Sequence, residues 1–182
     1  MKKFISILLF SFICFTITVQ AASEERATKA FTAIESNSSI DIIITQGDEY
    51  KITVVASEKY LHKIETKVMA GTLVVDVKGN IYSTEDFEVH VTVQNLKEII
   101  MNASGDIEIE GLLQAESLVI EVHGSGDFEG DLNVKDLDIS LHGSGDVELS
   151  GVNGSLNAEL YGSGDFEADN FHLGNSYFSI NG

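Results

Sequence analysis

The chain has 182 residues, with 11 Lys and Arg against 29 Asp and Glu, a formal charge of -18, one Cys, and no Pro or Trp. Hydrophobic residues make up 43% of the chain, which is ample for a core, so the acidity does not indicate disorder. A charge this negative excludes nucleic acid and anionic membrane surfaces as simple electrostatic partners.

Residues 1–21 have the pattern of an export signal. Lys2 and Lys3 precede an uncharged, mostly apolar stretch from Phe4 to Val19, and small residues follow from Ala21. We expect cleavage after Ala21 and an exported protein, either periplasmic or at the cell surface, with no membrane span after cleavage. The alternative is a lipoprotein signal at Cys14, which the large residue before that cysteine disfavours. Cleavage removes two of the eleven cations and no acid, which leaves a charge of -20.

The part between the signal and residue 100 is strand-rich but irregular. We expect residues 22–30 to be a flexible N-terminal segment and residues 31–100 to form an irregular β part. Alternating apolar residues predict strands at 39–44, 50–55, 72–77 and 87–93. These strands fit either early coils of the structure that follows or a separate antiparallel sheet. The absence of a Gly/Ser/Pro-rich linker favours one continuous structure.

Residues 101–182 carry a repeated turn motif, Gly-Ser-Gly-Asp or a close variant. Alternating apolar runs before and after each turn predict strands. The unit repeats about every 20 residues, and self-similarity at such a period is typical of a solenoid. We therefore predict an all-β fold, a parallel β-solenoid (β-helix) with turns at a period of 19–21 residues. The four turn aspartates, whose residue numbers rise in steps of 21, 19 and 19, are Asp106, Asp127, Asp146 and Asp165.

The order of these segments resembles a known bacterial family. An exported N-terminus precedes "FTAIESNSSIDIIITQGDEYKITVVAS", "VQNLKEIIMNASGDIEIEG" and the repeated "GSGD" units. Over about residues 31–182 the chain resembles the putative auto-transporter adhesin, head GIN domain family, long regarded as a domain of unknown function. The resemblance implies a β-helical fold, an exported bacterial setting and a suggested adhesive role, but it brings no established activity. The chain departs from the family name because it lacks a long C-terminal series of membrane strands.

The four turn aspartates are a candidate site because stacking would place them in one column. Two carboxylates about 4.8 Å apart repel by roughly 1 kcal/mol even in water, so other interactions must offset the repulsion within the column. Our preferred interpretation is turn chemistry, in which each carboxylate accepts hydrogen bonds from backbone N–H groups. The alternative is a calcium ladder, since calcium binds stacked carboxylates and loop carbonyls. Calcium-binding β-rolls have a period of nine residues, which this chain does not share.

The position before each turn carries flat side chains, including His123, His142 and Tyr161. We interpret this column as a stacking ladder on the surface and as a candidate binding feature. A transition-metal site is the alternative, but two histidines without a third convergent ligand are poor evidence for zinc.

The sequence favours a non-enzymatic binding, adhesion or envelope scaffold role, with an unknown protein or glycan as ligand. The turn serines recur four times without the G-x-S-x-G spacing, whereas a hydrolase needs one nucleophile with its own base. A carbohydrate-binding or carbohydrate-active β-helix, assisted by calcium, is the alternative. Lyases that act on uronic acids need cations, and the repeat half offers only Lys135.

A solenoid normally needs a capping element at its end. We expect the terminal coil, with Phe171, Phe178 and Ile180, to be covered by self-association or by a partner protein. A short, frayed last coil is the alternative.

Overall fold

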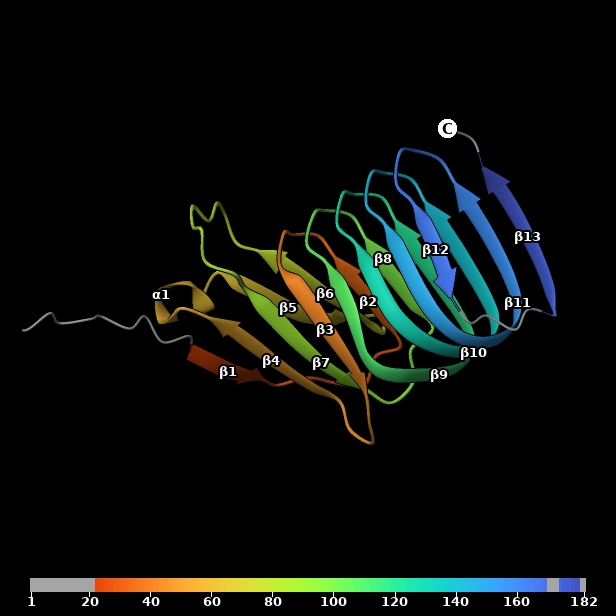
Figure 1. Ribbon diagram of the computed structural model, residues 1–182. Helices are drawn as coiled ribbons and strands as arrows, with labels where there is room; N and C mark the ends of the chain where they lie inside the picture. The colour runs from red at the N-terminus through yellow and green to blue at the C-terminus, as the bar shows by residue number, and fades with distance from the viewer. Residues whose placement is uncertain (1–21, 170–173, 181–182) are drawn as a thin grey trace, which may run out of the picture.

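The computed structural model describes residues 22–169 and 174–180, which form an all-β structure with one short helix (Figure 1). The predicted signal peptide, with Cys14, lies outside the described residues. The helix is α1 (Glu58–Leu61). The strands are β1 (Ala22–Arg26), β2 (Ala33–Ser36), β3 (Asp41–Gln46), β4 (Lys51–Ala56), β5 (Ile64–Met69), β6 (Thr72–Val77), β7 (Glu88–Val93), β8 (Glu98–Met101), β9 (Ile107–Val122), β10 (Phe128–Leu141), β11 (Val147–Leu160), β12 (Phe166–Asp169) and β13 (Asn175–Ile180).

All thirteen strands belong to one mixed sheet that curls into a nearly closed, barrel-like form (Figure 1). Its main path runs β1-β4-β7-β3-β9-β8-β2-β6-β5. The remaining strands extend from β9, because β10 pairs with β9, β11 pairs with β10, and both β12 and β13 pair with β11. The sheet is therefore continuous from the first described residue to the last strand.

The prediction of a parallel β-solenoid is wrong, because the sheet is partly antiparallel. β1 pairs antiparallel with β4, β4 with β7, and β5 with β6. Two local features explain the difference. The chain reverses at Ala70 and Gly71, both with positive φ, which closes a two-residue hairpin between β5 and β6. β7 also inserts between β3 and β4, so consecutive strands are not neighbours in the sheet.

Residues 22–26 were expected to be part of a flexible segment, but they form β1. This strand pairs with β4 over its whole length, from Ala22 opposite Ala56 to Arg26 opposite Ile52. Arg26 also donates a hydrogen bond from Nη2 to the Leu61 carbonyl, 2.8 Å away, next to α1. The free edge of β4 supplies hydrogen-bonding groups that this polar segment satisfies, so it becomes ordered.

The long strands β9, β10 and β11 pair in parallel within this mixed sheet, and their register follows the spacing of the turns. Phe128 lies opposite Val147 in β11 and opposite Ile107 in β9, so the offset in residue number is 19 on one side and 21 on the other. A bulge then restores an offset of 19 toward β9 as well, so that Asp131 lies opposite Leu112. The two extra residues in the first repeat include Gly111, with φ of +83°, where a glycine is favoured.

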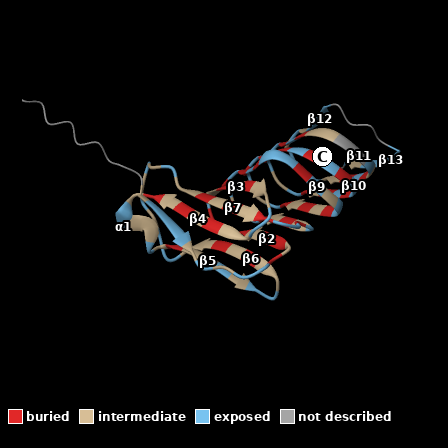
Figure 2. Ribbon diagram, turned by 90° about the horizontal axis from the view of Figure 1, so that it is seen from below, coloured by how far each residue is buried: buried red, intermediate tan, exposed pale blue. Residues whose placement is uncertain are grey.

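Apolar side chains from both halves form one continuous core. Along the strands, buried residues alternate with more exposed ones, as Figure 2 shows for β3, β4 and β7. Because the strands are in register, the buried residues stack in columns, such as Ile120, Ile139 and Ala158. The core therefore reaches from Phe31 to the last long strand, and the polar turns are left at its rim.

No helix among the described residues is long and apolar enough to cross a membrane.

Candidate functional site

The turn aspartates stack in a column and hold neighbouring turns together. The Oδ1 atom of Asp106 accepts a hydrogen bond from the Asp127 N–H at 2.8 Å. The Oδ1 of Asp127 accepts from Asp146 N–H, and that of Asp146 from Asp165 N–H, both at 2.8 Å. Each carboxylate thus satisfies a backbone donor of the next turn, which is the geometry that turn chemistry requires.

The column begins one turn earlier than the sequence repeat indicates. Asp41 Oδ1 accepts a hydrogen bond from the Asp106 N–H at 2.9 Å, and Asn102 donates to Asn37 Oδ1 at 2.8 Å. Residues 37–41 are therefore a first turn, although they lack the glycines of the motif. Partial burial raises the pKa of Asp41, and the hydrogen bond from the Asp106 amide opposes that shift.

Glycines in the later turns permit close approach of one backbone to the next. A Cβ at Gly126 would lie 2.2 Å from the Gly105 carbonyl oxygen, and one at Gly145 would lie 2.0 Å from the Gly126 oxygen. These contacts are far inside van der Waals distance and involve backbone rather than a flexible side chain. The motif is therefore a packing requirement of the stack.

The flat side chains before the turns also stack. The rings of His123 and His142 have centroids 5.4 Å apart and planes 22° apart. Those of His142 and Tyr161 are 4.9 Å and 1° apart. All three residues are exposed, and His123 Nε2 lies 3.2 Å from Glu121 Oε2. The geometry gives a surface column of rings, while its use as a binding feature remains a prediction.

No group of three or more His, Cys, Asp or Glu side chains that could hold a metal ion is found in the part of the chain that the structure describes. The carboxylates of the column are engaged with backbone N–H groups instead. A calcium ladder along Asp106, Asp127, Asp146 and Asp165 remains an untested hypothesis.

The last strand, β13, leaves apolar side chains exposed at the end of the core. Phe178 lies beside the buried Ala158, and Ile180 beside Leu160, so both continue inward-facing columns. They are nevertheless 46% and 73% exposed, and Tyr177 on the other face is 62% exposed. The third residue expected at this end, Phe171, lies outside the described residues.

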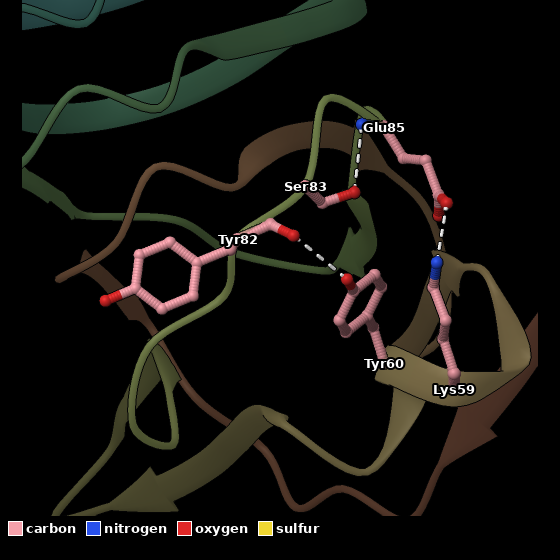
Figure 3. Close-up of polar contacts among 5 residues, drawn as sticks. All are labelled: Lys59, Tyr60, Tyr82, Ser83 and Glu85. Carbon is pink, nitrogen blue, oxygen red and sulfur yellow. Dashed lines mark hydrogen bonds and ion pairs between the residues drawn. The ribbon is translucent and has the colours of Figure 1, made fainter.

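At the opposite end of the turn column, the loop of residues 78–87 covers the first turn and is held by α1 and its flanks (Figure 3). Tyr60 donates from its hydroxyl to the Tyr82 carbonyl at 3.1 Å, and Lys59 pairs with Glu85 at 3.0 Å. The Glu85 N–H donates to Ser83 Oγ at 3.1 Å. The Ser57 hydroxyl and then Lys59 lower the pKa of Glu85. These contacts fix a loop that has no regular secondary structure.

A hollow of about 560 Å³ lies between this loop and the first turn. It is lined on one side by Ser38, Ser39 and Ile40 and on the other by residues that include Asn80 and Tyr82. Sequence analysis did not identify this region, because residues 78–87 show neither a motif nor a period. The one available signal was Tyr82, a large aromatic residue within a polar stretch.

Comparison with known proteins places this arrangement among bacterial proteins. A family model described as "Putative auto-transporter adhesin, head GIN domain" matches residues 30–182. No curated protein matches the chain.

Three solved structures share the fold. A putative adhesin from Bacteroides fragilis has a TM-score of 0.61 and 18% identity, over 90% of this chain and 96% of that one. A putative adhesin from Parabacteroides distasonis has a TM-score of 0.67 and 15% identity, over 88% and 78%. A protein from the same species, described as a putative lipid binding protein, has a TM-score of 0.66 and 20% identity, over 88% and 78%. At sequence identities this low, the similarity shows a shared fold and nothing about function.

Proposed function

The chain belongs to the putative auto-transporter adhesin, head GIN domain family, and we propose that it is an exported binding protein that serves adhesion or an envelope scaffold, without enzymatic activity. The observation that carries the proposal is β13, an uncharged and exposed strand at the end of an acidic sheet. Such a strand suits contact with another protein by addition of a strand to the sheet.

The charge pattern of the sheet favours contact at this strand. Moving along the stack, Asp136 lies beside Ser155, and Asp138 lies beside Asn157, which in turn lies beside Tyr177. These two outward positions thus lose their charges toward β13, which has the sequence Asn-Ser-Tyr-Phe-Ser-Ile and carries no charge. Natural edge strands normally carry charge or Pro to prevent pairing, and β13 carries neither.

We take the occupant to be a second copy of the chain, with the two β13 strands antiparallel about a two-fold axis. This arrangement would cover Phe178 and Ile180 of both copies. It would also keep the strongly acidic repeats of the two copies apart on opposite sides of the contact. Because two bodies of like charge repel over about 10 Å at 0.1 M salt, we expect association to strengthen as salt is raised.

Light scattering of the mature protein, at increasing concentration and at two salt concentrations, tests this contact. We expect a concentration-dependent dimer in the wild type and a monomer in Ile180→Lys, which puts a charge on the exposed edge. Leu112→Lys is the matched control, since Leu112 is also exposed but lies in β9. A wild-type protein that is strictly monomeric at high concentration contradicts the self-association proposal.

The adhesive role needs a separate assay. We expect the labelled mature protein to be retained by at least one of cell-envelope fractions, host matrix proteins and glycans, and a uniform absence of retention would contradict the adhesive role. Because one structural neighbour is described as a putative lipid binding protein, the same assay should also include vesicles of zwitterionic lipid.

A further inference from the structure

The hollow beside loop 78–87 occupies the place where one more turn would stack. In the later turns, a Cβ at Gly124 would meet the backbone of Ala103, and a Cβ at Gly143 would meet that of Gly124. Side chains at this turn position are therefore directed toward the preceding turn. Ser38 holds the same position in the first turn, and what precedes it is the hollow.

This position excludes a stacked peptide turn as the occupant. Close stacking requires glycine at the residue before the turn aspartate, as at Gly105 and Gly126, whose Cβ atoms would lie 2.3 and 2.2 Å from a carbonyl oxygen of the preceding turn. The first turn has Ile40 at this position, so a further turn cannot stack there in the same way. The hollow is thus shaped for a small molecule, and its volume of about 560 Å³ lies in the range of small-ligand pockets.

The polar groups that a ligand in the hollow can reach are the Asn80 side chain and the Ser39 hydroxyl. Both residues line the hollow and are exposed. Asn80 Nδ2 donates to the Tyr82 hydroxyl at 3.3 Å, and Ser39 Oγ lies 3.1 Å from Ser104 Oγ. The Ser38 Oγ atom is buried behind this surface and does not take part.

Tyr82 supplies a fixed aromatic face at the mouth of the hollow. Tyr82 is 86% exposed, yet its backbone carbonyl accepts from the Tyr60 hydroxyl (Figure 3). Its own hydroxyl accepts from Asn80 Nδ2 at 3.3 Å. Lys63 Nζ donates to the Asn80 carbonyl at 2.9 Å, which holds the same loop. A large exposed ring that is held in place in this way is suited to contact with the apolar face of a ligand.

The charges of the lining select against anionic ligands. No Lys, Arg or His lines the hollow among the described residues, so a phosphate or a carboxylate ligand would be repelled. Its two carboxylates are already engaged, because Asp76 Oδ1 accepts from the Val77 N–H at 2.7 Å and Glu85 pairs with Lys59. Amides, hydroxyls and one aromatic face remain for recognition.

We propose that this hollow binds a neutral saccharide, whose hydroxyl groups meet Ser39 and Asn80 while one sugar face packs on Tyr82. The site does not depend on β13 or on self-association. It adds a small-molecule ligand to a protein whose proposed contact lies at the other end of the sheet.

An array of neutral and uronic-acid glycans, followed by calorimetry with the strongest neutral oligosaccharide, tests the proposal. We expect binding of at least one neutral glycan and none of the uronic-acid glycans. Tyr82→Ala should weaken the affinity about tenfold, since it removes an aromatic contact. Tyr177→Ala is the matched control, because it removes another exposed tyrosine, from β13, and it should leave the affinity unchanged.

Ser39→Ala gives a second readout that does not depend on the ring. It removes an exposed hydroxyl that lies 3.1 Å from Ser104 Oγ, so the melting temperature should change little, while the affinity for the same oligosaccharide should weaken. Absence of binding to every neutral glycan, or an equal loss in Tyr177→Ala and Tyr82→Ala, would overturn the proposal. A monomeric protein that still binds the glycan would instead refute self-association alone.

Discussion

Replacement of Gly126 by Ala should destabilise the stack far more than an ordinary substitution in a surface turn. The added Cβ would lie 2.2 Å from the Gly105 carbonyl oxygen, so the two turns must separate by about 1 Å to reach even a tight contact. Overpacking of this kind typically costs about 1–3 kcal/mol. The separation also stretches the bonds from Ser125 N–H to Ala103 O and from Asp127 N–H to Asp106 Oδ1, now 3.2 and 2.8 Å.

If both hydrogen bonds are lost, each adds roughly 1 kcal/mol, so we expect a total loss of about 3–5 kcal/mol in the free energy of unfolding. Urea unfolding of the mature protein, followed by far-ultraviolet circular dichroism, measures this quantity. Gly47→Ala is the glycine control, because its Cβ would meet only the Thr92 methyl group, and Ser125→Ala is the control within the same turn. A Gly126→Ala variant as stable as Gly47→Ala would refute close backbone stacking as the reason for the motif.

Three further predictions concern the aspartate column. Asp41→Asn keeps the acceptor for the Asp106 N–H but removes a carboxylate whose pKa is raised by burial, so it should increase stability at pH 7. The gain in stability should shrink as the pH falls through the raised pKa of Asp41 and should vanish below the ordinary pKa of an aspartate. Urea unfolding of the wild type and of Asp41→Asn at pH 7 and at about pH 3 measures the gain. A variant less stable than the wild type at pH 7 would contradict the prediction. Asp146→Ala, which removes the acceptor for the Asp165 N–H, should cost about 1 kcal/mol, whereas Asp146→Asn should cost almost nothing. Millimolar calcium should leave the melting temperature of the wild type and of Asp146→Asn unchanged within about 1 °C, and a clear rise in the wild type alone would favour the calcium ladder.

The repeat half could be predicted in detail because its information is local. The steps of 21, 19 and 19 between the turn aspartates correspond to the register of β9, β10 and β11 and to the bulge before Asp131. The column of His123, His142 and Tyr161 follows from the same spacing. Because the strands are in register, equivalent residues of successive repeats lie beside one another. The spacing of the turns is therefore enough to predict which residues stack.

The N-terminal half could not be predicted in the same way. Whether β3 pairs with β4 or with β7 depends on contacts between segments that lie far apart in the sequence, and the alternating pattern is the same in either case. The first turn escaped recognition because Ser38 and Ile40 stand where the motif has glycine. Ile40 marks the place where stacking stops, because the equivalent residue is glycine in every later turn. This departure from the motif therefore indicates where the candidate site lies.

In the part of the chain that the structure describes, β10 pairs only with β9 on one side and with β11 on the other. Insertion or deletion of one whole repeat unit at this point would therefore preserve every pairing on both sides of it. Each added unit would move β13 about 4.8 Å farther from loop 78–87, because that is the spacing between neighbouring strands. The number of repeat units would thus set the distance between the two ends of the sheet.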